Sequence, residues 1–167
     1  MINGSSHENN PSLQVFLWPC LFESGRAAGS CDAIGNVRFI CGVNSAEDIV
    51  AVPESEWVVA SGVRAPGALE LVNTRDDETV IGLLPGHKLQ SRFDARTYGS
   101  CPGPLDVGAE GERFRPHGLN IVRGRNTVHK FYVVHHGGRE AIEVFDIDVC
   151  GKVPALTWID VSSRPRQ

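Results

Sequence analysis

Short runs of β-branched and aromatic residues alternate along this chain with clusters of Gly, Pro, Asn and Asp. This pattern is typical of β-strands separated by turns, and helix signals are scarce. A first group of expected strands covers residues 48–52, 57–61, 68–73 and 79–84. A second group covers residues 117–122, 130–135, 141–148 and 155–160. The pattern therefore predicts an all-β protein.

The two groups look like one structural unit used twice. Asp48 and His117 occupy matching places, and each is followed by a short strand, a polar turn and a strand with an aromatic residue, Trp57 or Phe131. Four antiparallel strands per repeat form the blade of a β-propeller. A single β-sandwich of about eight strands fits the same periodicity.

We therefore predict a partial β-propeller over residues 13–161, with about two four-stranded antiparallel blades. The blades are expected at about residues 44–85 and 114–161, with an irregular loop at 86–113 between them. Residues 1–12 are expected to be disordered and residues 162–167 to form a polar tail. A propeller closes with typically 4 to 8 blades, so open blade edges are expected here, and these favour self-association.

Composition narrows the range of partners. The formal charge is −4 and the basic residues are scattered, which argues against nucleic-acid binding. A membrane-spanning helix needs about 20 apolar residues, and the sequence contains no such run, so no membrane span is expected. The five cysteines contain no Cys-x-x-Cys pair, and their pairing stays open, as does the compartment.

Two histidines are the main candidates for chemistry. His117 opens one expected strand and His136 follows the next, so a hairpin would bring both imidazoles to one rim of the sheet. Such a pair can move protons near neutral pH, because the unperturbed pKa is about 6.5. Strand alternation sends His135 and His136 to opposite faces, and either one could face the site. His129, on the same face as His135, is assigned to the surface.

These motifs, taken in order, resemble the calcium-dependent six-bladed propellers of the paraoxonase (arylesterase) and gluconolactonase-like group. The residues that carry the resemblance are Glu47-Asp48-Ile49, the segment 57–62, Pro116-His117-Gly118-Leu119, and Val133-Val134-His135-His136 ahead of Glu143-Val144-Phe145. Cys101-Pro102-Gly103-Pro104 looks like the corresponding segment of the bacterial members. One departure is His135, where the paraoxonases carry Asn.

The resemblance implies a hydrolase of lactones or aryl esters. An acidic residue at the Glu47 position binds calcium in that family, and Asp48 beside it is a second candidate ligand. Calcium takes about 6 to 8 oxygen ligands and polarises a carbonyl group. His117 matches the catalytic base and His136 matches its partner in proton transfer.

The family's other calcium ligands come from blades downstream of this segment, so the site is expected to be incomplete here. The alternative is a non-catalytic truncated propeller fragment or a binding module.

Overall fold

The computed structural model describes residues 31–76, 79–85, 89–93 and 103–162, with side chains to residue 159. The described residues form nine strands: β1 (Ala46–Ala51), β2 (Trp57–Gly62), β3 (Ala68–Asn73), β4 (Val80–Leu84), β5 (Gln90–Ser91), β6 (Phe114–Val122), β7 (Val128–Gly137), β8 (Ala141–Asp148) and β9 (Ala155–Ser162). No helix occurs among them, which confirms the all-β prediction. The described residues therefore include no helix that could cross a membrane. The expected disordered residues 1–12 and residues 163–167 of the expected tail lie outside the described residues.

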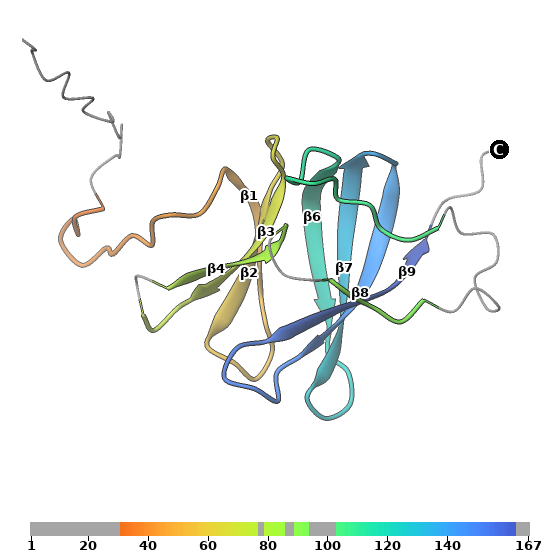
Figure 1. Ribbon diagram of the computed structural model, residues 1–167. Coiled ribbons are helices and arrows are strands. Elements are labelled where there is room, and N and C mark those ends of the chain that lie inside the picture. The colour runs from red at the N-terminus through yellow and green to blue at the C-terminus, as the bar shows by residue number, and fades with distance from the viewer. Residues whose placement is uncertain (1–30, 77–78, 86–88, 94–102, 163–167) are drawn as a thin grey trace, which may run out of the picture. The chain divides into compact units, whose positions relative to one another are not determined.

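The first sheet is an antiparallel meander in which β1, β2, β3 and β4 are neighbours in chain order (Figure 1). The paired residues Val59 and Leu71 are both fully buried and belong to the core. The turn after β3 depends on Asn73, whose Oδ1 accepts the backbone N–H groups of Arg75 at 2.9 Å and Asp76 at 3.2 Å. Such Asx turns are a common use of Asn.

The second sheet has the order β5-β9-β8-β7-β6, and all its pairs are antiparallel except β5 with β9. β5 lies in the segment expected to be an irregular loop. Its two residues pair with Thr157 and Trp158, and Phe93 just after it stacks on the Trp158 ring at 5.4 Å. A two-residue pairing leaves no periodic pattern in a sequence, so sequence analysis missed it.

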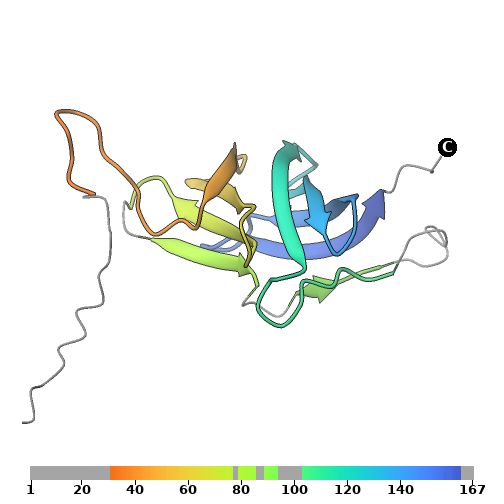
Figure 2. The same cartoon turned by 90° about the horizontal axis from the view of Figure 1, so that it is seen from above.

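The two sheets share one hydrophobic core. Its largest buried side chains include Trp57, Phe114, Phe131, Phe145 and Trp158. β1 and β6, the first strands of the two meanders, are in contact (Figure 2). Burial of these aromatic faces is the main term that holds the sheets together. Ahead of β1, Cys31 and Cys41 form a disulfide.

Candidate functional site

The candidate site begins at an irregularity in β6. The pairing with β7 passes from Pro116–His135 directly to Leu119–Val133, so His117 and Gly118 lie opposite Val134 alone. This is a β-bulge, a device that turns a strand and redirects a side chain. β6 is an edge strand, which is where a proline such as Pro116 is tolerated.

Two side chains of the first sheet hold the bulge in place. Ser61, fully buried on β2, donates from Oγ to the carbonyl oxygen of His117 at 2.6 Å. Asp48 on β1 accepts the backbone N–H of Leu119 on Oδ2 at 2.7 Å. The bulge takes these backbone groups out of the β6–β7 ladder, and the first sheet supplies their partners. The orientation of His117 is therefore set jointly by both sheets.

His117 and Glu47 face each other across the contact between β6 and β1. Nε2 of His117 lies 3.0 Å from Oε1 of Glu47, and their side chains are 46% and 47% exposed. A carboxylate oxygen accepts, so Nε2 is the donor and the lone pair of the neutral imidazole lies on Nδ1. Glu47 thereby selects the tautomer of an imidazole that solvent can reach.

His136 lies next to His117, as the hairpin prediction required. The two ring centroids are 5.6 Å apart, and Nδ1 of His136 lies 2.5 Å from Oε2 of Glu140. Glu47, His117, His136 and Glu140 thus form a continuous line of carboxylate, two imidazoles and carboxylate. Sequence analysis missed Glu140, because a short turn at Gly137 and Gly138 decides whether that side chain meets His136.

His135 points to the opposite face of β7 and is only 1% exposed. Its Nδ1 lies 3.0 Å from Oε1 of Glu143, and its Nε2 lies 3.0 Å from the carbonyl oxygen of Arg113. Of the two alternatives left open by the sequence, His136 is therefore the residue beside His117. The assignment of His129 to the surface was wrong, because this side chain is fully buried.

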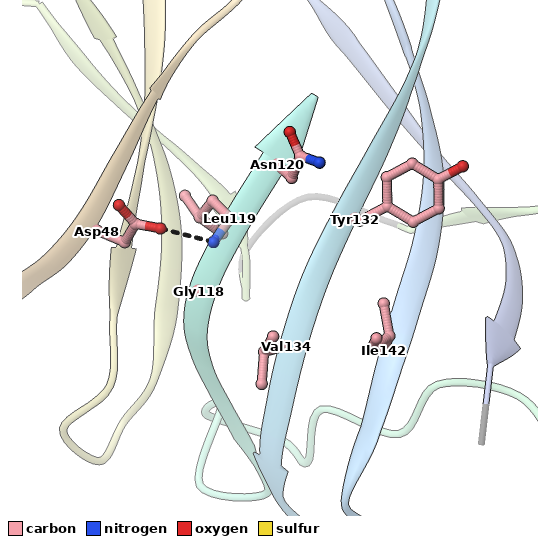
Figure 3. Close-up of a pocket in the computed structure, with 7 residues that line it drawn as sticks. All are labelled: Asp48, Gly118, Leu119, Asn120, Tyr132, Val134 and Ile142. Atoms are coloured by element: carbon pink, nitrogen blue, oxygen red, sulfur yellow. Dashed lines mark hydrogen bonds between the residues drawn. The ribbon is translucent and has the colours of Figure 1, made fainter. Parts of the chain in front are cut away.

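An open pocket of about 450 Å³ lies on the same face of the second sheet (Figure 3). Figure 3 shows that its residues come from β1, β6, β7 and β8: Asp48, Gly118, Leu119, Asn120, Tyr132, Val134 and Ile142. Tyr132, Val134 and His136 alternate along β7, so they share one face of the sheet and the pocket adjoins the histidine pair. Its walls are mainly apolar.

The expected calcium ligands are engaged in other contacts. Oδ1 and Oδ2 of Asp48 accept the backbone N–H groups of Ile49 at 2.8 Å and Leu119 at 2.7 Å. One oxygen of Glu47 is hydrogen-bonded to His117. Within the described part of the chain, no group of three or more His, Cys, Asp or Glu side chains is arranged to hold a metal ion. These residues do not by themselves fit calcium, which wants about 6 to 8 oxygen ligands.

No protein-family model, no curated protein and no solved structure matches this chain.

Proposed function

We propose that the two sheets are consecutive blades of a β-propeller. The support is topological: each sheet contains four antiparallel strands that are neighbours in chain order, and the first strands of the two meanders lie against each other. In propellers the blades are four-stranded and surround a central channel. On this arrangement Glu47, Asp48 and His117 would lie on the strands nearest that channel.

We propose that the site belongs to a hydrolase of lactones or aryl esters, with His117 as general base. The observation that carries this proposal is the 3.0 Å contact between His117 and Glu47, with the ring of His136 at 5.6 Å. Glu47 accepts the Nε2 proton, so Nδ1 of His117 takes a proton from water as the water oxygen attacks the carbonyl carbon. His136 then receives that proton. Its Nδ1 donates to Glu140, which leaves Nε2 free to accept. When the tetrahedral intermediate collapses, its C–O bond to the leaving alcohol or phenol breaks, and the leaving oxygen takes the proton from the His136 imidazolium.

The adjoining pocket supports an apolar substrate. Its walls would cover an acyl chain or an aryl ring, while the ester or lactone carbonyl lies beside the histidines. Glu47 and Asp48 are hydrogen-bonded to other groups and provide too few oxygen ligands to hold calcium by themselves.

A non-catalytic binding module is the second candidate, and one observation favours it. Asp48 and Ser61 hold the β6 bulge by hydrogen bonds, and Glu47 and His117 satisfy each other. The same hydrogen bonds would be found if these residues only held the two sheets together. The open apolar pocket would then bind a ligand that the protein does not convert.

Hydrolysis of an aryl acetate and of a δ-lactone tests the enzyme proposal. We expect His117→Gln to lower kcat/KM by about 10²- to 10⁴-fold, the range for a general base. Glu47→Gln should lower it less, because this residue only orients His117. Glu54→Gln, which changes a surface carboxylate paired with Arg123, serves as the matched control and should leave the rate unchanged. Equal rates for wild type and His117→Gln would exclude the base. If wild type does not hydrolyse either substrate but binds them, the second candidate stands.

A further inference from the structure

Two buried histidines lie on the core-facing side of β7. One of them faces hydrogen-bond acceptors, and the other faces a donor. His129 and His135 are six residues apart and are 0% and 1% exposed. An imidazole nitrogen that faces an acceptor must carry a proton, and one that faces a donor must not. The partners therefore report the protonation state of each ring.

Both ring nitrogens of His135 face acceptors. Nδ1 faces a carboxylate oxygen of Glu143 and Nε2 faces the carbonyl oxygen of Arg113, each at 3.0 Å. A neutral imidazole has only one N–H group and can satisfy only one of these acceptors. We propose that His135 is an imidazolium in the folded protein. Its second proton, on Nε2, then forms a pH-sensitive hydrogen bond to Arg113 that fastens residues 103–113 to the second sheet, and this hydrogen bond is called the latch.

The charges around His135 are compatible with a buried cation. Among the described residues, β8 contributes Glu143 and the β7–β8 turn contributes Arg139, which donates to the Glu143 carboxylate from Nε at 2.6 Å and Nη2 at 2.8 Å. The 103–113 segment contributes Asp106 and the Arg113 guanidinium, which pair with each other at 2.5 Å. β6 and β9 present the Phe114 ring and the Trp158 indole, which carry no charge.

Glu143 acts as the counter-ion of this cluster. It also accepts the indole N–H of Trp158 at 2.8 Å. Burial opposes its ionisation, but the hydrogen bonds from His135, Arg139 and Trp158 outweigh that effect, and the pKa of Glu143 is lowered. A carboxylate that stays ionised at the centre of the cluster favours the protonated form of the adjacent imidazole.

The 103–113 segment is held to the second sheet at both of its ends, and the latch acts at the Arg113 end. The carbonyl oxygen of Arg113 accepts from His135 Nε2 and from the backbone N–H of Gly138 at 2.9 Å. At the other end, Arg139 Nη1 donates to the carbonyl oxygen of Gly103 at 2.8 Å. The three contacts converge on a polar cavity of about 210 Å³ between the segment and the sheet.

Loss of the second proton would open the latch at Arg113. The remaining proton stays on Nδ1, because the carboxylate is the stronger acceptor. The Nε2 lone pair then faces the carbonyl oxygen of Arg113 at 3.0 Å, and the two repel each other. The latch is therefore closed at lower pH and loosens as pH rises. β6 starts at Phe114, the next residue, so this loosening reaches the strand that carries His117. The inference does not depend on the proposed hydrolase activity.

His129 provides an internal reference. Its Nδ1 accepts the backbone N–H of Gly124 at 3.2 Å, so that nitrogen carries no proton and the ring is the neutral Nε2–H tautomer. Its Nε2 has no hydrogen-bond partner among the described residues. The geometry thus assigns opposite states to two buried histidines on one strand.

Nitrogen-15 NMR of the imidazole side chains tests the assignment in the wild-type chain. The spectrum is recorded one to two pH units above about 6.5, where an ordinary histidine is neutral. We expect both nitrogens of His135 to have protonated chemical shifts, while His129 shows the neutral Nε2–H pattern. A single neutral tautomer at His135 would overturn the proposal.

Amide hydrogen exchange then tests the latch itself. We expect the protection factor of the Gly138 amide to be at least about tenfold lower when His135 carries one proton than when it carries two. The amide of Leu71, in a central strand of the first sheet, is the reference and should keep its protection factor. If the protection of Gly138 stays level with that of Leu71 while the NMR signals of His135 titrate, there is no latch.

Discussion

At the scale of single residues, Glu143 holds together a cluster of buried polar side chains. It is fully buried and accepts from His135, Arg139 and Trp158. Glu143→Gln keeps the shape but removes the charge, which leaves His135 and Arg139 without a counter-ion. We expect the free energy of unfolding at neutral pH to fall by about 3–5 kcal/mol, the cost of breaking a buried ion pair. Denaturant unfolding measures this change.

The contribution of Glu143 to the free energy of unfolding should depend on pH. The pKa of Glu143 is lowered in the folded state from its ordinary value of 4.5. Its contribution to stability is therefore fully present above about pH 4.5 and is lost as pH falls through the lowered folded-state pKa. Wild type and Glu143→Gln should converge in strongly acidic solution. Glu140→Gln, at the 77% exposed partner of His136, is the control and should change stability by less than about 1 kcal/mol. A constant gap between wild type and Glu143→Gln at every pH would contradict this account.

At the scale of elements, periodicity located the described strands except β5, but contacts with other strands set where β6 begins and where it bulges. The bounds expected for residues 68–73 and 141–148 agree with β3 and β8, because turn-forming residues flank these apolar runs clearly. β6 begins three residues earlier than expected, since Phe114 to Pro116 pair with the end of β7. The bulge after Pro116 depends on Ser61 and Asp48, which lie far away in the sequence. A local pattern carries no information about such partners.

The loop between β2 and β3 meets β6 at Gly67, and that contact gives a prediction for the packing of elements. A Cβ atom at Gly67 would overlap the carbonyl oxygen of Phe114 and lie 2.8 Å from its carbonyl carbon. We expect Gly67→Ala to lower the free energy of unfolding by at least about 1–3 kcal/mol, because backbone atoms must move to make room.

Gly82→Ala on β4 is the matched control, since the nearest atom to its added Cβ is the carbonyl oxygen of Pro85 at 3.8 Å. This substitution should be neutral, or stabilising by about 0.5–1 kcal/mol, because glycine in a strand is entropically unfavourable. Thermal unfolding of both variants measures the difference. Equal effects would mean that the β2–β3 loop does not pack closely on β6.

The site itself was predicted in part. Simple hairpin geometry brought His117 and His136 together, and alternation separated His136 from His135. The sequence did not reveal that Asp48 holds the bulge or that Glu140 contacts His136. Both contacts depend on side-chain direction at irregular backbone, where neither strand nor helix periodicity applies. The catalytic roles stay predictions.

At the scale of the whole molecule, exposed apolar side chains on the two sheets lead us to predict self-association. Ile49 on β1 and Ile142 on β8 are 60% and 42% exposed. We expect sedimentation velocity to show a larger species as protein concentration rises, and Ile142→Thr to shift the chain toward the monomer. Val153→Thr is the control, because Val153 is 43% exposed but lies outside the strands. A wild-type chain that is monomeric at every concentration would contradict this prediction.

Calcium binding is also a property of the whole folded molecule, because an ion that binds only the native state raises its stability. We expect millimolar calcium to leave the thermal midpoint of this chain unchanged. Asp48 already accepts two backbone N–H groups, so of the two expected ligands only Glu47 has an oxygen left for the ion. Calcium affinity follows the number and charge of its oxygen ligands. Differential scanning fluorimetry with calcium, with magnesium and with a chelator measures this. A midpoint that rises with calcium, is unaffected by magnesium and loses its calcium response in Glu47→Gln would instead establish Glu47 as a ligand.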